Sequence, residues 1–141
     1  MSDALSRPRV TELAKMIGLD ITDFSEGRCI VECTIREDHL NMGGAVHGGI
    51  HATILDTSMG GTLVSTLPKK EWCATAQLDI SYINSVGVGT RLIASSEVVR
   101  RGRNLAHVEG RLIAEDGTLV ATAKGTWAVW EGRPSSQGAS Q

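Results

Sequence analysis

The sequence lacks the long apolar runs and the excess of basic residues that mark membrane and nucleic-acid-binding proteins. No segment approaches the roughly 18 to 20 apolar residues that are needed to span a bilayer. Residues 1–10, MSDALSRPRV, contain no apolar run of the kind that forms a signal peptide or an anchor. The formal net charge is −2, so no basic field attracts nucleic acid. We therefore expect a cytoplasmic protein with no membrane and no nucleic-acid partner.

Cysteine is also scarce. Cys29, Cys33 and Cys73 cannot all pair with one another, and none belongs to a Cys-x-x-Cys arrangement. In a strand, Cys29 and Cys33 would face the same side as small core residues. This pattern indicates a reducing compartment, in agreement with the cytoplasmic location.

The 141 residues are enough to bury one hydrophobic core, and they contain no internal repeat. We expect a single domain over residues 1–141. Residues 1–8 and the polar tail 132–141 are expected to be flexible at its two ends.

The spacing of apolar residues predicts two helices. A short one covers residues 10–18, with Gly18 as its C-terminal stop. A longer one, free of proline, runs from Gly48 to about Leu67, and Pro68 ends it.

The long helix contains an unfavourable pair, Gly60 and Gly61. Each glycine costs about 1 kcal/mol in a helix relative to alanine. Small residues at these positions make sense if a sheet wraps tightly around the helix.

Elsewhere apolar and polar residues alternate, which is typical of half-buried strands. The predicted strands cover residues 28–36, 74–82, 91–101, 105–115 and 119–130. In the second strand one face is expected to hold Ala74, Ala76, Leu78, Ile80 and Tyr82, and the other Thr75, Gln77, Asp79 and Ser81. One short helix, one strand, one long helix and four antiparallel strands make an α+β protein. We expect a curved antiparallel sheet around the long helix.

The segment HLNMGGAVHGGIHATILDTSMGGTL concentrates the chemistry. Asn41 precedes His47 by six residues, Gly48 and Gly49 follow it, and Asp56 is the one acid between Asp38 and Glu71. Glycines at a helix start leave N–H groups that suit a carbonyl oxygen gaining negative charge. A carboxylate on a largely apolar helix is costly without a partner or a purpose.

These residues resemble the hotdog-fold acyl-CoA thioesterases, in particular the phenylacetate-pathway (PaaI-like) type. The matching positions are Asn41, Gly44, His47, Gly48, Gly49, Leu55 and Asp56. The resemblance continues through residues 74–86 and 98–126 and so covers most of the chain. It implies a hotdog fold and hydrolysis of an acyl-CoA thioester to a free acid and CoA. It also implies a homodimer, often paired into a homotetramer, with active sites at the subunit interface.

The resemblance also implies roles for single residues. Asp56 would act as nucleophile or general base, and the Gly48 N–H would polarise the thioester carbonyl. Asn41 would position the substrate, and Thr75 would orient the water. His47 either supports the loop or contacts the site directly. Against this role for Thr75 stands its predicted strand face, which is the less apolar one.

Other readings of single groups stay open. Arg100, Arg101 and Arg103 suit the phosphates of CoA, and they equally suit a solvated basic hairpin. His47 and His51 have the spacing of a metal-binding helix, but Gly48 replaces the glutamate of His-Glu-x-x-His. We therefore expect no metal and no cofactor, with CoA entering only as part of the substrate.

Two alternative functions remain at this stage. A hotdog enoyl-CoA hydratase would use an Asp and a His at a different spacing, on a motif that this sequence lacks. A non-catalytic acyl-CoA-binding protein would usually carry an added DNA-binding segment. The preferred acyl group stays open, because two subunits would supply the pocket walls.

Overall fold

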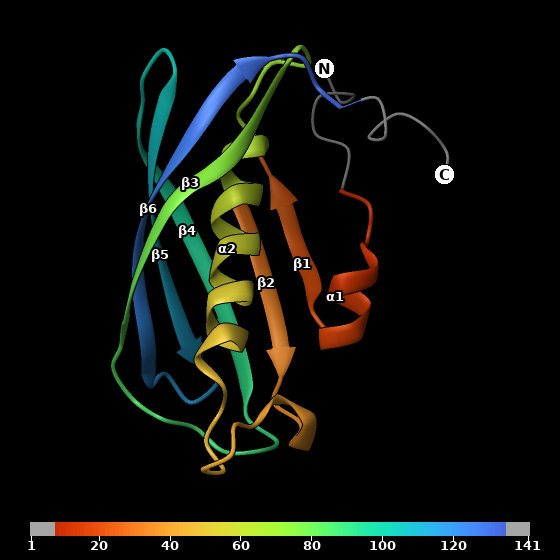
Figure 1. The fold of residues 1–141 in the computed structure, drawn as a ribbon, viewed down its shortest axis with the longest axis vertical. Coiled ribbons are helices and arrows are strands. Elements are labelled where there is room, and N and C mark those ends of the chain that lie inside the picture. The colour runs from red at the N-terminus through yellow and green to blue at the C-terminus, as the bar shows by residue number, and fades with distance from the viewer. Residues whose placement is uncertain (1–7, 135–141) are drawn as a thin grey trace.

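The computed structural model describes residues 8–134 as a curved antiparallel sheet wrapped around a long helix (Figure 1). The helices are α1 (Glu12–Ile17), the 3-10 helix η2 (Glu37–His39) and α2 (Gly48–Val64). The strands are β1 (Asp20–Ser25), β2 (Arg28–Thr34), β3 (Glu71–Tyr82), β4 (Arg91–Arg101), β5 (Leu105–Ala114) and β6 (Leu119–Glu131). They form a six-stranded sheet in the order β1-β2-β4-β5-β6-β3. The predicted α+β architecture is confirmed.

Most elements form where the sequence places them, with small differences at their ends. The long helix ends at Val64, before the predicted Leu67. Gly18 ends α1 in the left-handed conformation, with φ of 86°, as predicted. Between β2 and α2, residues 37–39 form the single turn of η2.

Strand β1 has no counterpart among the predicted strands. Its register with β2 shifts between Ile21 and Asp23, where Thr22 is an extra residue. The core-packed side chains of Ile21 and Phe24 are therefore separated by three positions instead of two. This irregular spacing hides the strand from a search for simple alternation.

Helix α2 lies unusually close to the concave face of the sheet. Its buried residues are His51, Ile54, Leu55, Ser58, Met59, Thr62 and Leu63. A Cβ atom at Gly61 would lie 2.5 Å from Cys29 Sγ, and one at Gly110 on β5 would lie 2.8 Å from Met59 Sδ. Glycine is required where the helix and the sheet approach this closely, which explains the costly glycine in the helix.

Strand β3 forms one edge of the sheet and contains a bulge. Its register with β6 shifts between Thr75 and Gln77, so that Ala76 is the extra residue. The bulge reverses the alternation of side chains along the strand. Thr75, which precedes the bulge, and Tyr82, which follows it, both donate hydrogen bonds to α2. The prediction that Ala74 shares a face with Leu78, Ile80 and Tyr82 is therefore wrong, and Ala74 and Ala76 are both exposed.

We expected both ends of the chain to be flexible. Most of that prediction concerns residues 1–7 and 135–141, which lie outside the described residues. The start of the tail is anchored. Gly132 N donates to Lys70 O at 2.7 Å, and Arg133 Nε donates to Glu71 O at 3.1 Å. The tail is thus tied to the beginning of β3 as far as Arg133.

Replacing Gly60 and Gly61 by alanine, one at a time, should separate the effect of helix propensity on stability from the effect of packing against the sheet. At Gly60 the nearest neighbour of an added Cβ is Trp127 Nε1 at 3.5 Å, an ordinary contact. Gly60→Ala should raise the free energy of unfolding by up to about 1 kcal/mol. Gly61→Ala should lower it by about 1–3 kcal/mol, because its methyl group meets Cys29. Urea denaturation at equal protein concentration measures both values, and equal effects would contradict the close packing.

Candidate functional site

The first turn of α2 is capped by the histidine that precedes it. His47 is the N-cap, and its Nδ1 accepts a hydrogen bond from Gly49 N at 2.8 Å. The preceding N–H, that of Gly48, has no acceptor within residues 8–134. The cap therefore leaves the Gly48 N–H, at the positive end of the helix dipole, available to a ligand oxygen.

The loop before the helix is organised by Asn41. Its amide oxygen accepts from Gly43 N at 2.9 Å and from Ala45 N at 3.1 Å. Gly44 takes a φ of 83° in the same loop. The Asn41 side chain thus shapes the loop that leads to Gly48.

Tyr82 holds the helix start from the other side. Its hydroxyl donates to Gly48 O at 2.8 Å, and a Cβ at Gly48 would lie 3.1 Å from this oxygen. Sequence reasoning gave Tyr82 no role beyond the strand pattern. The contact between the end of β3 and the start of α2 is visible only once the sheet has folded around the helix.

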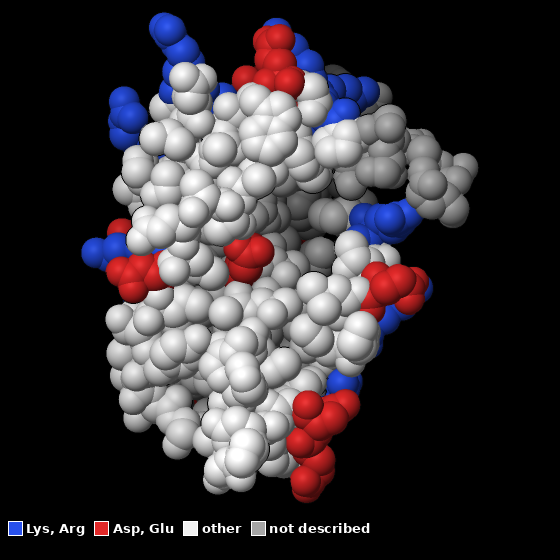
Figure 2. Space-filling model, in the orientation of Figure 1, with Lys and Arg blue, Asp and Glu red and all other residues white. Residues whose placement is uncertain are grey.

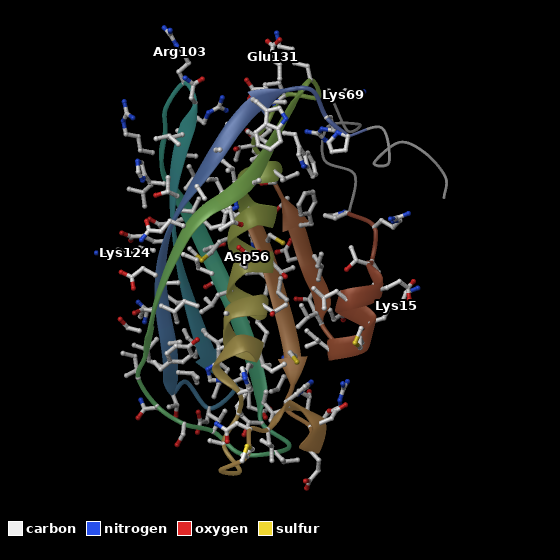
Figure 3. All side chains as sticks on the ribbon, viewed as in Figure 1. Lys15, Asp56, Lys69, Arg103, Lys124 and Glu131 are labelled. Atoms are coloured by element: carbon white, nitrogen blue, oxygen red, sulfur yellow. The ribbon has the colours of Figure 1, made fainter. Side chains whose placement is uncertain are left out.

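Asp56 lies midway along α2, next to the edge strand (Figure 3). Thr75 Oγ1 donates to Asp56 Oδ1 at 2.7 Å. Figure 2 shows an acidic group surrounded by uncharged surface, at the place where Figure 3 labels Asp56 in the same orientation. The β3 bulge explains how Thr75 reaches the helix although the simple strand pattern turned it away.

Gly48 and Asp56 cannot act on one thioester within a single chain. They are eight residues apart on one continuous helix, which separates them by roughly 12 Å along its axis. An oxyanion donor and an attacking group must both lie about 3 Å from the reacting carbonyl. The distance along the helix is therefore about twice the roughly 6 Å that can separate two groups in contact with one carbonyl.

Cys73 lies two residues before Thr75 and is buried. Burial raises the pKa of the Cys73 thiol from 9.0 to about 11, against opposing contributions from Arg133 and Arg101. Because the thiolate is the nucleophilic form of cysteine, the thiol is inert at neutral pH. Cys73 therefore offers no competing nucleophile beside Asp56, whose role as nucleophile or general base stays a prediction.

His51 is a feature that sequence reasoning considered only as a metal ligand. Its side chain is 4% exposed, and neither ring nitrogen has a hydrogen-bond partner within the described residues. Leaving a buried polar group unpaired costs about 1–3 kcal/mol. No sequence pattern signals this, because it depends on how the ring packs in the folded protein.

The three arginines differ in their surroundings. Arg101 Nη1 lies 2.9 Å from Glu71 Oε1, and this contact lowers the pKa of the Glu71 carboxyl. Arg100 and Arg103 are exposed. Figure 3 places Arg103 at the tip of the β4–β5 hairpin, at the opposite end of the molecule from the start of α2.

Residues 8–134 contain neither a candidate metal site nor a helix that could span a membrane. Within this range no group of three or more His, Cys, Asp or Glu side chains is placed to hold a metal ion. No helix in the same range combines the length and apolar character that crossing a membrane requires.

The model of the thioesterase superfamily matches residues 43–121. A putative esterase of Halobacterium salinarum is 32% identical over 129 residues, which cover 84% of each chain. Human acyl-coenzyme A thioesterase 13 is 25% identical over 77% of each chain. The E. coli PaaI protein from the phenylacetic acid degradation operon has the same fold, with a TM-score of 0.80, 22% identity and 86% of each chain covered. A conserved protein of Pseudomonas aeruginosa gives a TM-score of 0.80 at 27% identity, covering 86% of this chain and 95% of its own.

The raised pKa of Cys73 predicts a shifted reactivity profile. In the folded protein, alkylation of Cys73 by iodoacetamide should rise near pH 11, and in the unfolded chain near pH 9. Since the folded pKa is the higher one, the associated stability is present below about pH 9 and is lost as the pH rises toward 11. Peptide mapping by mass spectrometry after short pulses reports the rate at each pH. Equal rates for folded and unfolded protein at pH 9 would contradict the burial.

Proposed function

The chain belongs to the thioesterase superfamily and is a thioester hydrolase, and we propose that it converts acyl-CoA thioesters to free carboxylic acids and CoA. Support for CoA as the carrier comes from the similarity to acyl-coenzyme A thioesterase 13. The observation that carries the proposal is the Asp56–Thr75 pair. A lone carboxylate is held by a hydroxyl, on an otherwise uncharged helix face, beside an open sheet edge.

Gly48 polarises the thioester carbonyl through its backbone N–H. Two features support this role: the N–H is not used by the His47 cap, and Tyr82 holds the same residue by its carbonyl. As the carbonyl carbon is attacked, negative charge moves onto the oxygen. A fixed donor at a helix N-terminus stabilises that charge without rearranging.

Asp56 supplies the attack by one of two routes. As a nucleophile, its carboxylate bonds to the carbonyl carbon, the C–S bond breaks to release CoA, and water then hydrolyses the mixed anhydride. As a general base, it takes a proton from the water that attacks the same carbon. Thr75 holds the carboxylate, and Asn41 orients the substrate from the loop. Both routes need the negative charge of Asp56.

The site combines two copies of this chain. The spacing of Gly48 and Asp56 along α2 supports a site in which one chain supplies the glycine and its partner the acid. Strand β3 leaves a long edge open in the described structure, and proteins usually pair or cover such an edge. We propose a homodimer joined along β3. Two-fold symmetry gives such a dimer two equal sites, and a homotetramer would contain two such dimers.

The proposed reaction needs only the thioester substrate and water, with no cofactor and no metal. Arg100 and Arg103, exposed on the β4–β5 hairpin, are proposed to bind the CoA phosphates, with Arg101 held beside them by Glu71. Cys29, Cys33 and Cys73 are buried thiols. This fits the reducing cytoplasm, which we propose as the location.

Removing the charge of Asp56 should stop turnover without unfolding the protein. Asp56→Asn keeps the size of the side chain but leaves a poor nucleophile and a poor base. The rate of thiol release from an acyl-CoA should fall by at least about 10², and Thr75→Ala should have a smaller effect. Asp20→Asn, an exposed acid on β1, serves as the control, and a chelator should leave the wild-type rate unchanged. Near wild-type turnover by folded Asp56→Asn would remove Asp56 from the chemistry.

Mixing two inactive variants should restore activity if the site is shared. Asp56→Asn lacks the acid, and Gly48→Val fills the space beside Tyr82 and blocks approach to the N–H. After unfolding and refolding an equal mixture, half of the dimers contain both variants, and each has one intact site of two. Activity should therefore recover to about a quarter of the wild-type value. No recovery in a mixture shown by native mass spectrometry to contain hybrid dimers would contradict the shared site.

A further inference from the structure

The hydroxyl of Tyr82 lies close to the Gly48 N–H. It donates to Gly48 O at 2.8 Å, and a Cβ atom at Gly48 would lie 3.1 Å from the hydroxyl oxygen. In standard backbone geometry, a Cβ atom is about 2.5 Å from the nitrogen of its own residue. The Tyr82 oxygen is therefore at most about 5.6 Å from the Gly48 nitrogen.

A single oxygen atom can accept hydrogen bonds from both groups at this separation. The acceptor lies about 2.9 Å from the nitrogen of an N–H donor and about 2.8 Å from the oxygen of a hydroxyl donor. Together these two bonds span about 5.7 Å, which covers the largest separation between the two donors. An oxygen that is bound at the Gly48 N–H is therefore within reach of the Tyr82 hydroxyl.

The space beside these two donors is open and has no lysine or arginine in its walls. Gly48 and Tyr82 both line a cavity of about 560 Å³, and the Tyr82 side chain is 53% exposed. Asn84 also lines the cavity, but its side-chain amide donates to Leu119 O at 2.8 Å. An oxygen that gains negative charge at this wall must therefore be stabilised by hydrogen-bond donors such as the hydroxyl of Tyr82.

The phenol ring is held in a fixed position. It stacks on the ring of His51, with centroids 5.7 Å apart and an angle of 26° between the planes. His51 is buried, so one face of the phenol ring rests on the interior of the protein. The backbone of Tyr82 pairs with Ala121 on β6, and the next N–H, that of Ile83, donates to Val120 O at 2.8 Å. A donor fixed in this way can stabilise a developing charge without rearranging.

We propose that the Tyr82 hydroxyl is a second donor to the thioester oxygen and acts together with the Gly48 N–H. The inference rests on the proposed function, because the thioester is the substrate proposed there. A hydroxyl has one hydrogen, so it leaves Gly48 O when it turns toward the substrate. This turn needs rotation about the C–O bond alone. Gly48 is the first residue of α2, so its carbonyl keeps the helix bond from the residue four positions on.

The exchange of acceptors favours the transition state over the bound substrate. With the bound thioester, the hydroxyl exchanges one neutral carbonyl for another and gains little. As the carbonyl carbon is attacked, the thioester oxygen becomes negative, and a hydrogen bond to a charged acceptor is roughly twice as strong as one between neutral groups. Because the gain appears in the transition state, Tyr82 should raise kcat and leave KM nearly unchanged.

Removal of the hydroxyl tests this kinetic consequence. Tyr82→Phe should lower kcat for acyl-CoA hydrolysis by about 10², the scale of one oxyanion donor, with KM nearly unchanged. Ser81→Ala removes a hydroxyl from the preceding, exposed residue of β3 and should change neither constant. Urea denaturation checks that both variants are folded. Wild-type kcat in Tyr82→Phe would overturn the inference and leave the proposed function intact, whereas a wild type that hydrolyses no acyl-CoA would contradict the proposed function.

Two ketone analogues of hexanoyl-CoA distinguish a direct donor from a residue that only holds Gly48. In both, CH₂ separates the sulfur from the carbonyl, so neither is hydrolysed, and in one of them CF₂ follows the carbonyl. The fluorines favour addition of water or of the Asp56 carboxylate to the carbonyl carbon, which places negative charge on the oxygen. Compared with the wild type, Tyr82→Phe should bind the CF₂ ketone about 10²-fold more weakly and the plain ketone equally well. An equal loss of affinity for both ketones, or no loss for either, would overturn the inference.

A spectroscopic label detects the contact itself and does not depend on turnover. Tyr82 is the single tyrosine of the sequence, so 3-fluorotyrosine incorporated during expression labels this position alone. Its fluorine lies next to the hydroxyl, and the fluorine-19 resonance responds to the hydrogen bond that the hydroxyl makes. The resonance should move further with the CF₂ ketone than with the plain ketone. Equal movement with both, or no movement with either, would assign Tyr82 to holding Gly48 and overturn its role as a donor.

Discussion

The close contact between α2 and the concave face of the sheet governs the remainder of the structure. Gly61 on the helix and Gly110 on β5 lie where any larger residue would collide with a neighbour. Packing at this distance determines both the position and the rotation of the helix. Ile54, Leu55 and Met59 are turned into the core, while Asp56 is turned toward the edge strand, where Thr75 receives it. Asp56, the proposed nucleophile or base, thus owes its position to glycines that take no part in the proposed chemistry.

A rigid helix also dictates how the chemistry must be shared. Gly48 at its start and Asp56 in its middle stay roughly 12 Å apart whatever the side chains do. In the proposed dimer, two-fold pairing would bring the start of one helix near the middle of the other without bending either, and the open edge of β3 offers backbone groups for that pairing. In this account, dimer formation is part of the catalytic mechanism, and the thioester lies where two incomplete half-sites meet.

Regular patterns in the sequence predicted much of this arrangement. Clean alternation located β2 and β5, and the lone acid on an apolar helix singled out Asp56, whose catalytic role stays a prediction. What the sequence concealed comes from irregularities. The extra residue Thr22 hid β1, and the bulge at Ala76 turned Thr75 toward the helix against the simple pattern. The unpaired ring of His51 was hidden for another reason: it depends on contacts between segments that are distant in the chain.

The central claim is that one thioester is held by the Gly48 N–H of one chain and attacked by the Asp56 of another. A crystal structure of the Asp56→Asn protein with a ketone analogue of an acyl-CoA tests this directly. The account predicts the analogue's carbonyl oxygen about 3 Å from Gly48 N of one protomer, with the side chain at position 56 of its partner beside the carbonyl carbon. A carbonyl bound by one chain alone, or one distant from position 56 of both chains, would contradict it.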